Sequence, residues 1–432
     1  MTFSPDAYVW VWLPGHTAPV VAGALARTDQ MVAGETVLAY TYGRSYLSRP
    51  DRLALFTPEL PLRDSTFDPA SPQPSPDWRG YTPEGGRRPL PLAGCLRDAA
   101  PDTWGRRVIN ACRAANPDTH LDELTYLLAS ASDRIGALDF QTSSTVYEPR
   151  GGQATLEQLA RVAELIDAGE PIPEDLVAAA GHGTSVGGAR PKALLTDGGG
   201  RHWVAKFSSS TDDRPVVKAE AVGMLLAQKI GINAPAVQVT QAAGKDVLLV
   251  ERFDRTVGGG RRMVVSALTI LGLDEPSARY SSYADLAAAI RHAGWVDPAR
   301  QLHELFTRMV LNIAVSNTDD HLRNHAAFWD GTKLTLTPAF DVAPQRRSTS
   351  VATHAIALNS DGNRFSQFRV ARVAGGPFGI SEREAAAIID HVESTIRSSW
   401  DDVCDEAQLT QNERQQLWGR EILNDYATWD QA

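Results

Sequence analysis

The chain has 432 residues, and its apolar content of 43% and charged content of 22% are those of an ordinary globular protein. This length exceeds what one hydrophobic core usually serves, so we expect two domains or lobes with a cleft between them. The formal charge of −10 does not supply the basic face that a nucleic-acid backbone needs, which disfavours direct DNA binding.

The cysteines and the apolar runs of the sequence indicate in which cellular compartment the protein is expected. Cys95, Cys112 and Cys404 lack metal-ligand spacing and are odd in number, as expected for reduced thiols in a cytosol. No run approaches the ~20 apolar residues that a membrane-spanning helix requires, and no signal-peptide pattern opens the chain. We therefore predict a cytoplasmic protein without a membrane partner.

The first part of the chain is predicted to be rich in strands. Residues 8–13 and 36–40 are short aromatic and β-branched runs bounded by turn residues, which is typical of strands. A helical pattern follows from residue 92, and in it Arg106 and Arg107 are expected to pair with neighbouring acids. These patterns predict a small β-rich subdomain with helices after it.

A glycine-dense segment at residues 181–192 is the first candidate for ligand binding. Its glycines allow backbone N–H groups to turn toward phosphate oxygens, and Lys192 at its end can neutralise charge. It is not a P-loop, because the G-K-[ST] ending is missing and a strand follows. Taken alone, such a loop is more often simply a turn.

Lys206 interrupts the apolar strand that comes next. Burying an unpaired ammonium is costly, so this side chain either faces solvent or meets anions. In kinases, a strand lysine after a glycine loop contacts the nucleotide phosphates. Glu220, in the first turn of the following predicted helix, either favours the positive end of the helix dipole or orients Lys206.

The apolar strand at residues 247–250 runs out into the polar segment 251–255. Between two lobes, such a segment is where a kinase hinge binds adenine; otherwise it is an ordinary charged strand end. Beyond residue 260 the patterns are mostly helical, including a capping box at Ser381 and Glu384. A final helix is expected at about residues 410–426. The second half of the chain is therefore predicted to be α-rich.

An acid-rich stretch at residues 316–324 lies in this helical half, and Asp341 follows it after a short hairpin. Asp319 precedes Asn324 by five residues, the interval between the proton-accepting Asp and the metal-binding Asn of the kinase catalytic loop. Asp341 then supplies a second metal ligand. The stretch predicts one half of a phosphoryl-transfer site.

Other interpretations of the same stretch stay open. Asp319, Asp320, His321 and His325 are residue types of a transition-metal hydrolase site, because the two histidines are four apart and would share a helix face. The chain is alternatively a lipid or small-molecule kinase, since no motif reveals the acceptor.

The motifs occur in one order along the chain: the glycine loop 181–192, Lys206, residues 250–255, residues 318–324 and residues 340–341. In that order they resemble the HipA family of serine/threonine kinases, the toxins of bacterial type II toxin–antitoxin pairs, over nearly the full length. The resemblance implies an α+β, two-lobed protein-kinase-like fold with an additional N-terminal β-rich subdomain and an α-helical C-terminal lobe.

The same resemblance divides the chain into three parts. Residues 1–150 are the N-terminal HipA-type subdomain, residues 151–255 the kinase N-lobe with the Gly-rich loop, and residues 256–432 the α-helical C-lobe with the catalytic and metal-binding motifs. It also implies ATP and Mg²⁺ as cofactors, a protein substrate with a Ser or Thr acceptor, and a HipB-like antitoxin. DNA would be reached only through the antitoxin, and a homodimer within that complex is left open. A non-catalytic scaffold in such an antitoxin–DNA repressor complex is the alternative to an active kinase.

Particular roles follow from the resemblance. Asp319 is the expected catalytic base, Asn324 and Asp341 are the expected Mg²⁺ ligands, and His321 is expected to order the loop by hydrogen bonds to backbone. Ser185 is the expected autophosphorylation site, whose added charge beside the ATP phosphates would switch the enzyme off. The expected nucleotide-site residues are Ser185, Val186, Gly187, Gly188, Lys192, Lys206, Glu251, Phe253, His321, Asn324 and Asp341.

Two positions depart from the family pattern. Asp320 stands where Gly is frequent, which is expected to add a carboxylate beside the base. Arg190 and Pro191 replace a more usual polar, acidic pair before Lys192. Neither change removes a required group, so activity is still expected.

Overall fold

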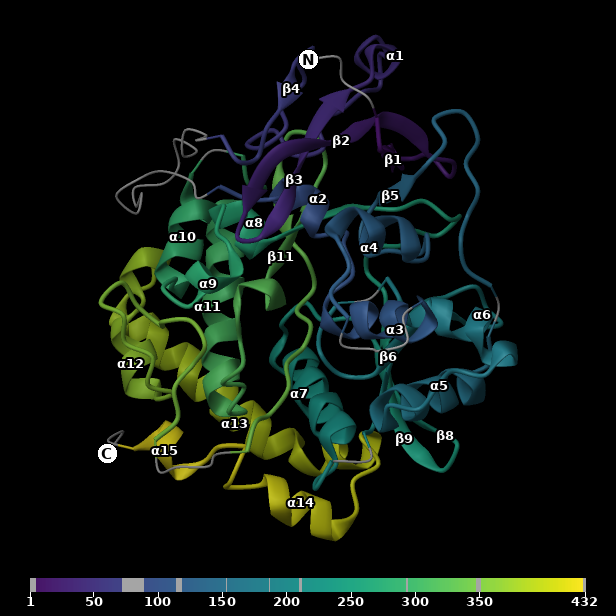
Figure 1. The fold of residues 1–432 in the computed structure, drawn as a ribbon. Coiled ribbons are helices and arrows are strands. Elements are labelled where there is room, and N and C mark those ends of the chain that lie inside the picture. The colour runs from purple at the N-terminus through teal and green to yellow at the C-terminus, as the bar shows by residue number, and fades with distance from the viewer. Residues whose placement is uncertain are drawn as a thin grey trace.

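The computed structural model describes residues 5–71, 89–113, 119–152, 154–185, 187–209, 212–292, 294–346 and 351–429. Val186, one of the predicted nucleotide contacts, lies outside these ranges. Figure 1 shows a sheet of N-terminal strands at the top, the helices of the second half on one side below it, and a second sheet on the other side. Helix α7 lies between the two lower parts.

A five-stranded antiparallel sheet forms the N-terminal part, in the order β4-β3-β2-β1-β5. The predicted strands near residues 8–13 and 36–40 are present as β1 and β3, whereas the long β2 between them was missed. Its elements are β1 Ala7–Val11, β2 Val20–Val32, β3 Glu35–Tyr42, β4 Thr66–Phe67 and β5 Leu138–Gln141, with helices α1 Arg44–Leu47, α2 Gly94–Arg97, α3 Thr103–Arg113 and α4 Glu123–Ala129.

A four-stranded antiparallel sheet of order β6-β7-β9-β8 makes the middle part. Helix α7 packs on β8 and β9 and ends at Gly231, whose φ of 94° is the left-handed geometry that glycine adopts freely. The elements are α5 Leu156–Ala168, α6 Val177–Ala180, β6 Lys192–Thr196, β7 His202–Phe207, α7 Val216–Ile230, β8 Val237–Ala242 and β9 Lys245–Glu251, with 3₁₀ turns η1 Glu174–Leu176 and η2 Gly181–Gly183.

The remaining part is mostly helical around a three-stranded sheet of order β10-β11-β12. The predicted final helix is wrong as one element, because the chain turns at Gly419, with φ 72°, and separates α14 from α15. The elements are β10 Met263–Ser266, α8 Ala267–Leu271, α9 Glu275–Ala278, α10 Tyr283–Arg291, α11 Pro298–Ala314, η3 Leu322–Asn324, β11 Ala326–Trp329, β12 Leu334–Leu336, α12 Phe368–Val373, η4 Gly376–Phe378, α13 Glu382–Glu406, α14 Gln411–Leu417 and α15 Asp425–Thr428.

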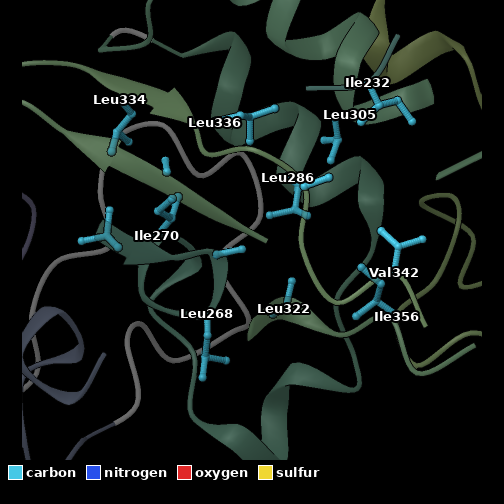
Figure 2. Packing of buried hydrophobic residues seen from close by; sticks show 14 of the residues in the cluster. Ile232, Leu268, Ile270, Leu286, Leu305, Leu322, Leu334, Leu336, Val342 and Ile356 are labelled. Atoms are coloured by element: carbon cyan, nitrogen blue, oxygen red, sulfur yellow. The ribbon is translucent and has the colours of Figure 1, made fainter. Parts of the chain in front are cut away.

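One apolar core runs from the N-terminal sheet into the helical part, and a second lies under β6, β7 and β9 against α5 and α6. Figure 2 shows Leu322, Val342 and Ile356 among the side chains of the larger core. Leu322 lies within the acid-rich stretch and Val342 directly follows Asp341, and burial of one such side chain is worth about 1.5–3 kcal/mol. The core therefore fixes the backbone on which the candidate site residues sit. In the described ranges, no helix combines the length and apolarity needed to cross a membrane.

Candidate active site

Lys206 is on β7, whose side chains alternate between buried and half-buried positions. The antiparallel register of β6 and β7 pairs Lys206 with Lys192. Directly paired residues of neighbouring strands project to the same face. The sheet therefore presents two lysines side by side on one face.

The Lys206 amine makes ion pairs with two carboxylates, those of Glu220 on α7 and of Asp341 after β12. Burial alone would lower the pKa of Lys206, but these two acids raise it well above its ordinary value. Burial likewise opposes ionisation of Asp341, yet Lys206 and Lys192 hold its pKa well below the usual range. The predicted partnership of Glu220 with Lys206 is thus confirmed in geometry, and burial raises the pKa of Glu220 while Lys206 opposes that shift.

The close approach of the Asp341 segment to α7 depends on a glycine. A Cβ at Gly223, one turn after Glu220, would lie 2.1 Å from the backbone oxygen of Val342. Asp341 itself has a φ of 59°, a left-handed conformation that costs a non-glycine residue roughly 1–3 kcal/mol. Such a strained conformation persists where surrounding contacts hold it. Here the contact with α7 at Gly223 and the ion pair with Lys206 of β7 hold Asp341.

Asp319 lies at the exposed tip of the loop that follows α11. Partial burial is the main cause that raises the pKa of Asp319, with Asp341 adding to the shift and His321 opposing it. The backbone carbonyl of Asp319 accepts a hydrogen bond of 3.3 Å from the side-chain amide of Asn324. Asn324 therefore helps to fix the loop that carries Asp319.

Asp320 adds a carboxylate close enough to Asp319 to help raise its pKa, as expected, but this carboxylate is turned into the core. Its side chain is buried, accepts a hydrogen bond from the hydroxyl of Tyr283, and lies 3.0 Å from Nε2 of His325. Asn312 of α11 donates to the same Tyr283 hydroxyl at 3.0 Å. Asp320 thus anchors the loop to α10 and α11.

The transition-metal interpretation of this stretch is also wrong in geometry. His321 and His325 are not on one helix face, because only the short turn η3 separates them and His325 turns inward to Asp320. Among the residues that the structure describes, no three His, Cys, Asp or Glu side chains are grouped so that they could hold a metal ion.

His321 does not order the loop by the expected backbone hydrogen bond. Its Nδ1 is buried and has no hydrogen-bond partner among the described residues, and it is the backbone carbonyl of His321 that accepts from Asn324. His325 takes the ordering role instead through Asp320. His321 remains close enough to Asp319 and Asp341 to influence the pKa of both carboxyls.

Asn324 and Asp341 offer donor atoms that suit Mg²⁺. The Asn324 amide nitrogen is bound to Asp319, and no described residue donates to its amide oxygen. Asp341 adds a carboxylate whose side chain remains 36% exposed although it pairs with Lys206. Magnesium prefers hard oxygen ligands and is usually held by one or two carboxylates together with substrate phosphates. The donor set therefore fits this ion.

The glycine loop lies against Lys192. A Cβ at Gly188 would lie 2.2 Å from the Lys192 amine, so the glycine, with φ 93°, leaves room for that amine. Ser185 is buried and its hydroxyl donates to the backbone carbonyl of Asp133 at 3.0 Å. Gly187 precedes Gly188 in the same loop. The Lys192 amine therefore lies next to Gly188, and the Ser185 side chain points into the protein toward Asp133.

The segment after β9 divides into two kinds of residue. The Phe253 ring is half-buried and its centroid lies 5.6 Å from that of Phe340, which precedes Asp341. Arg252 and Asp254 alternate with it and are buried in an ion pair of 2.8 Å. Glu251 ends β9 half-buried. Glu251 and Phe253 thus keep partly exposed side chains, while the charged pair of Arg252 and Asp254 is structural.

A family model for the HipA-like C-terminal domain matches residues 184–400, half of the chain. The chain belongs to the HipA family. The matched range contains both Lys206 and the stretch with Asp319, Asn324 and Asp341, and it leaves the N-terminal β-rich subdomain outside.

Solved and curated relatives extend this result. HipA from the HipA, HipB and operator DNA complex of Shewanella oneidensis MR-1 covers 96% of this chain and 96% of its own, at a TM-score of 0.67 and 16% identity. The proinflammatory kinase CtkA of Helicobacter pylori covers 54% of this chain and 94% of its own at 13% identity, but its TM-score of 0.37 supports no argument. A Sinorhizobium fredii protein named "Putative kinase Y4mE" is 26% identical over 148 residues, only 33% of its length and 32% of this chain. The predicted two-lobed kinase-like fold with an N-terminal β-rich subdomain is confirmed.

Several residues that hold the site together were not predicted in that role. Tyr283, Asn312 and His325 position the catalytic-type loop, although His325 was considered only as a metal ligand. Asn317 donates to Asn312 at 3.0 Å and to the backbone of Asp341 at 3.3 Å. The polar side chains Asn312 and Asn317, inside or directly after an apolar helix, were the only available hint. Asp102 and Trp104, described below, carried none.

Proposed function

We propose that this chain is a serine/threonine protein kinase that transfers the γ-phosphoryl group of ATP to a hydroxyl of a cellular protein. One observation carries the proposal: Lys206 of the middle sheet is paired with Glu220 and also with Asp341 of the helical part. This contact brings the predicted phosphate-binding lysine to the predicted metal ligand. Phosphoryl transfer depends mainly on such positioning and on electrostatic stabilisation.

Each residue then has a defined task. Lys206 and Lys192 bind phosphate oxygens, and Glu220 keeps Lys206 in place. Asn324 and Asp341 hold Mg²⁺, which supplies positive charge against the phosphate oxygens when bound. Asp319 accepts the proton of the acceptor hydroxyl, and its raised pKa suits a general base.

Ser185 is proposed as the site of an inhibitory autophosphorylation. Its hydroxyl is buried and bound to the Asp133 carbonyl, so the loop must leave this position before Ser185 reaches a phosphate donor. A phosphate on Ser185 has no hydroxyl proton to donate to that carbonyl and adds negative charge next to the ATP phosphates. Both effects disfavour return of the loop to the nucleotide.

Within this proposal the kinase acts as a toxin neutralised by a HipB-like antitoxin, through which it contacts DNA. The support is the likeness over 96% of the chain to a HipA solved with HipB and operator DNA. Binding of the antitoxin is expected to persist in Asp319→Asn, because that change leaves the fold intact. Co-elution of both proteins on a sizing column tests this, and loss of binding in the variant would contradict it.

The activity is tested by label transfer from γ-labelled Mg-ATP to protein, followed by identification of the labelled amino acid. Wild type should label serine or threonine, and Asp319→Asn should lose roughly 10³-fold or more of the rate. Asp390→Asn, an exposed aspartate on α13, serves as the control and should retain the rate. Undiminished transfer by Asp319→Asn refutes the assignment, and label found only in lipid or a small molecule favours the alternative acceptor.

A further inference from the structure

Two residues at the start of α3, far from the glycine loop in sequence, bind the loop backbone. The Asp102 carboxylate accepts a hydrogen bond from the backbone N–H of Gly188 at 3.0 Å. The backbone N–H of Trp104 donates to the carbonyl of Gly188 at 2.9 Å. Both backbone groups of this one glycine are thus bound by residues that precede the matched family domain.

The Trp104 side chain adds a third contact. Its indole N–H donates to the carbonyl of Lys192 at 2.8 Å, and the ring is buried with only 1% exposed. Its neighbour Gly105 permits the approach, since a Cβ there would lie 2.7 Å from the carbonyl of Thr184. The start of α3 therefore contacts the loop from Thr184 to Lys192.

Two further hydrogen bonds extend the attachment toward β5. The Thr184 hydroxyl accepts from the backbone N–H of Ala131 at 2.8 Å, and the Ser185 hydroxyl donates to the carbonyl of Asp133. Every one of these partners lies between residues 102 and 133. The N-terminal subdomain thus holds the loop at both of its ends.

We propose that Asp102 and Trp104 are positioning residues that hold the glycine loop over the phosphate-binding lysines. The N-terminal subdomain is then part of the nucleotide-binding machinery. The consequence for ATP rests on the proposed function, whereas the attachment of the loop does not.

The physical reason is the entropy of the loop. Glycine loses more backbone freedom on ordering than any other residue, so a loop with Gly187 and Gly188 is costly to fix in one conformation. A charge-assisted hydrogen bond is about twice as strong as a neutral one. Fixing the loop before ATP arrives removes this cost from the binding step, which raises affinity.

Asp102 is suited to this task by its charge and surroundings. Burial opposes its ionisation, but Arg323 of the catalytic-type loop and the N–H groups of Gly188 and Thr103 keep the pKa of Asp102 below its usual value. Lys192 contributes in the same direction. The carboxylate is therefore charged at neutral pH and lies in the field of cations from both halves of the candidate site.

Hydrogen exchange of the loop in the full chain tests the attachment without requiring any activity. Asp102→Asn should speed exchange in the peptide that contains Gly188 by roughly tenfold, the scale of one charged hydrogen bond. Trp104→Phe keeps most of the ring packing and removes only the bond to Lys192, so a smaller acceleration is expected. Asp122→Asn is the control, because Asp122 caps α4 and pairs with Arg27 away from the loop.

ATP kinetics supply the second measurement. Asp102→Asn should raise the KM for ATP by roughly tenfold with a smaller change in kcat, and Asp102→Glu should restore part of the affinity. Loop exchange that matches wild type in both Asp102→Asn and Trp104→Phe overturns the inference. Tighter ATP binding by Asp102→Asn also overturns it, because Asp102 would then compete with phosphate. Faster loop exchange in a protein that does not bind ATP would support the attachment and refute the proposed function alone.

Discussion

Two networks of buried charge, one built on lysine and one on arginine, both pair cations with carboxylates but have different uses. In the network around Lys206, one amine is shared by Glu220 and Asp341, and the side chain of Asp341 is still 36% exposed. Within the described ranges, no carboxylate lies within 4 Å of the neighbouring Lys192 amine. This network has cationic and anionic groups left to bind a ligand.

The second network joins the N-terminal subdomain to the segment after β9. Arg252 binds Asp254 through two hydrogen bonds of 3.0 and 2.8 Å, and Asp254 also accepts from the backbone N–H of Gly136 at 2.7 Å. Arg134, fully buried, pairs with Asp139 at 2.9 Å. Its carboxylates are saturated with donors, so it stabilises the contact between two parts of the chain.

The comparison shows that a shifted pKa does not by itself identify a ligand site. Burial opposes ionisation of Asp254, yet Arg252 and Arg255 lower its pKa to about 2, while the pKa of Asp341 is lowered by lysines in the same way. The Lys206 network differs from the Arg252 network because its Asp341 side chain is partly exposed and its charged groups can still bind a ligand. Each network can be broken by a single substitution with a distinct outcome.

The largest effect on stability is expected in the saturated network. Asp254→Asn removes the buried carboxylate that pairs with both Arg252 and Arg255, leaves Arg252 only its pair with Asp133, and should lower the free energy of unfolding by about 3–5 kcal/mol. Urea denaturation measures this loss. Asp246→Asn, which weakens a less buried pair with Lys218, is the control and should cost about 1 kcal/mol or less. Equal losses in the two variants would contradict the comparison.

Breaking the other network should cost less stability and more function. Lys206→Met leaves Glu220 and Asp341 unpaired, but water can reach Asp341, so a loss of about 1–3 kcal/mol in unfolding free energy is expected. ATP binding, followed by calorimetry, should be lost. Lys245→Met is the matched control on the same sheet, since Lys245 pairs with Glu164 at a more exposed position. Retained ATP affinity in Lys206→Met would show that Lys206 is only structural.

The smallest effect concerns pH. Burial and the adjacent Lys206 lower the pKa of Lys192 to about 8, so its amine loses its charge as the pH rises through that value. A phosphate beside the amine favours the charged form. ATP affinity should therefore fall by up to about tenfold between about pH 7 and pH 9, with proton uptake on binding.

Calorimetry in two buffers of different ionisation enthalpy measures both quantities for Lys192. Lys192→Arg keeps its charge over this range and should flatten the pH dependence. The assignment fails if wild type shows no such dependence or if Lys192→Arg shows the same one.

The parts of the site that are local in sequence were predictable. Asp319 and Asn324 are five residues apart on one loop, and Asp341 follows a single hairpin, so the interval alone pointed to their chemistry. Lys206 was visible as a cation inside an apolar strand. The order of these motifs also led to the fold, because a kinase-like pair of lobes is the arrangement that brings them together.

The parts that depend on contacts between distant segments were not predictable. Asp102 and Gly188 are 86 residues apart, and Gly136 and Asp254 are 118 apart, so neither contact produces a period or a motif. The burial of Asp320 was not predicted for a related reason: it depends on Tyr283 and His325, and nothing in the adjacent residues indicates a partner on α10. Strand β2 was missed because much of its outer half is exposed and polar.

The most direct test of the account is the intact mass of the protein after incubation with Mg-ATP. In the proposed function, Asp319, Asn324 and Asp341 act with Lys206 and the glycine loop as one ATP site, and Ser185 is the phosphate acceptor within the chain. Wild type should therefore gain the mass of a phosphoryl group, while Ser185→Ala and Asp319→Asn should gain none. A mass gain in Asp319→Asn equal to that of wild type would contradict the central claim.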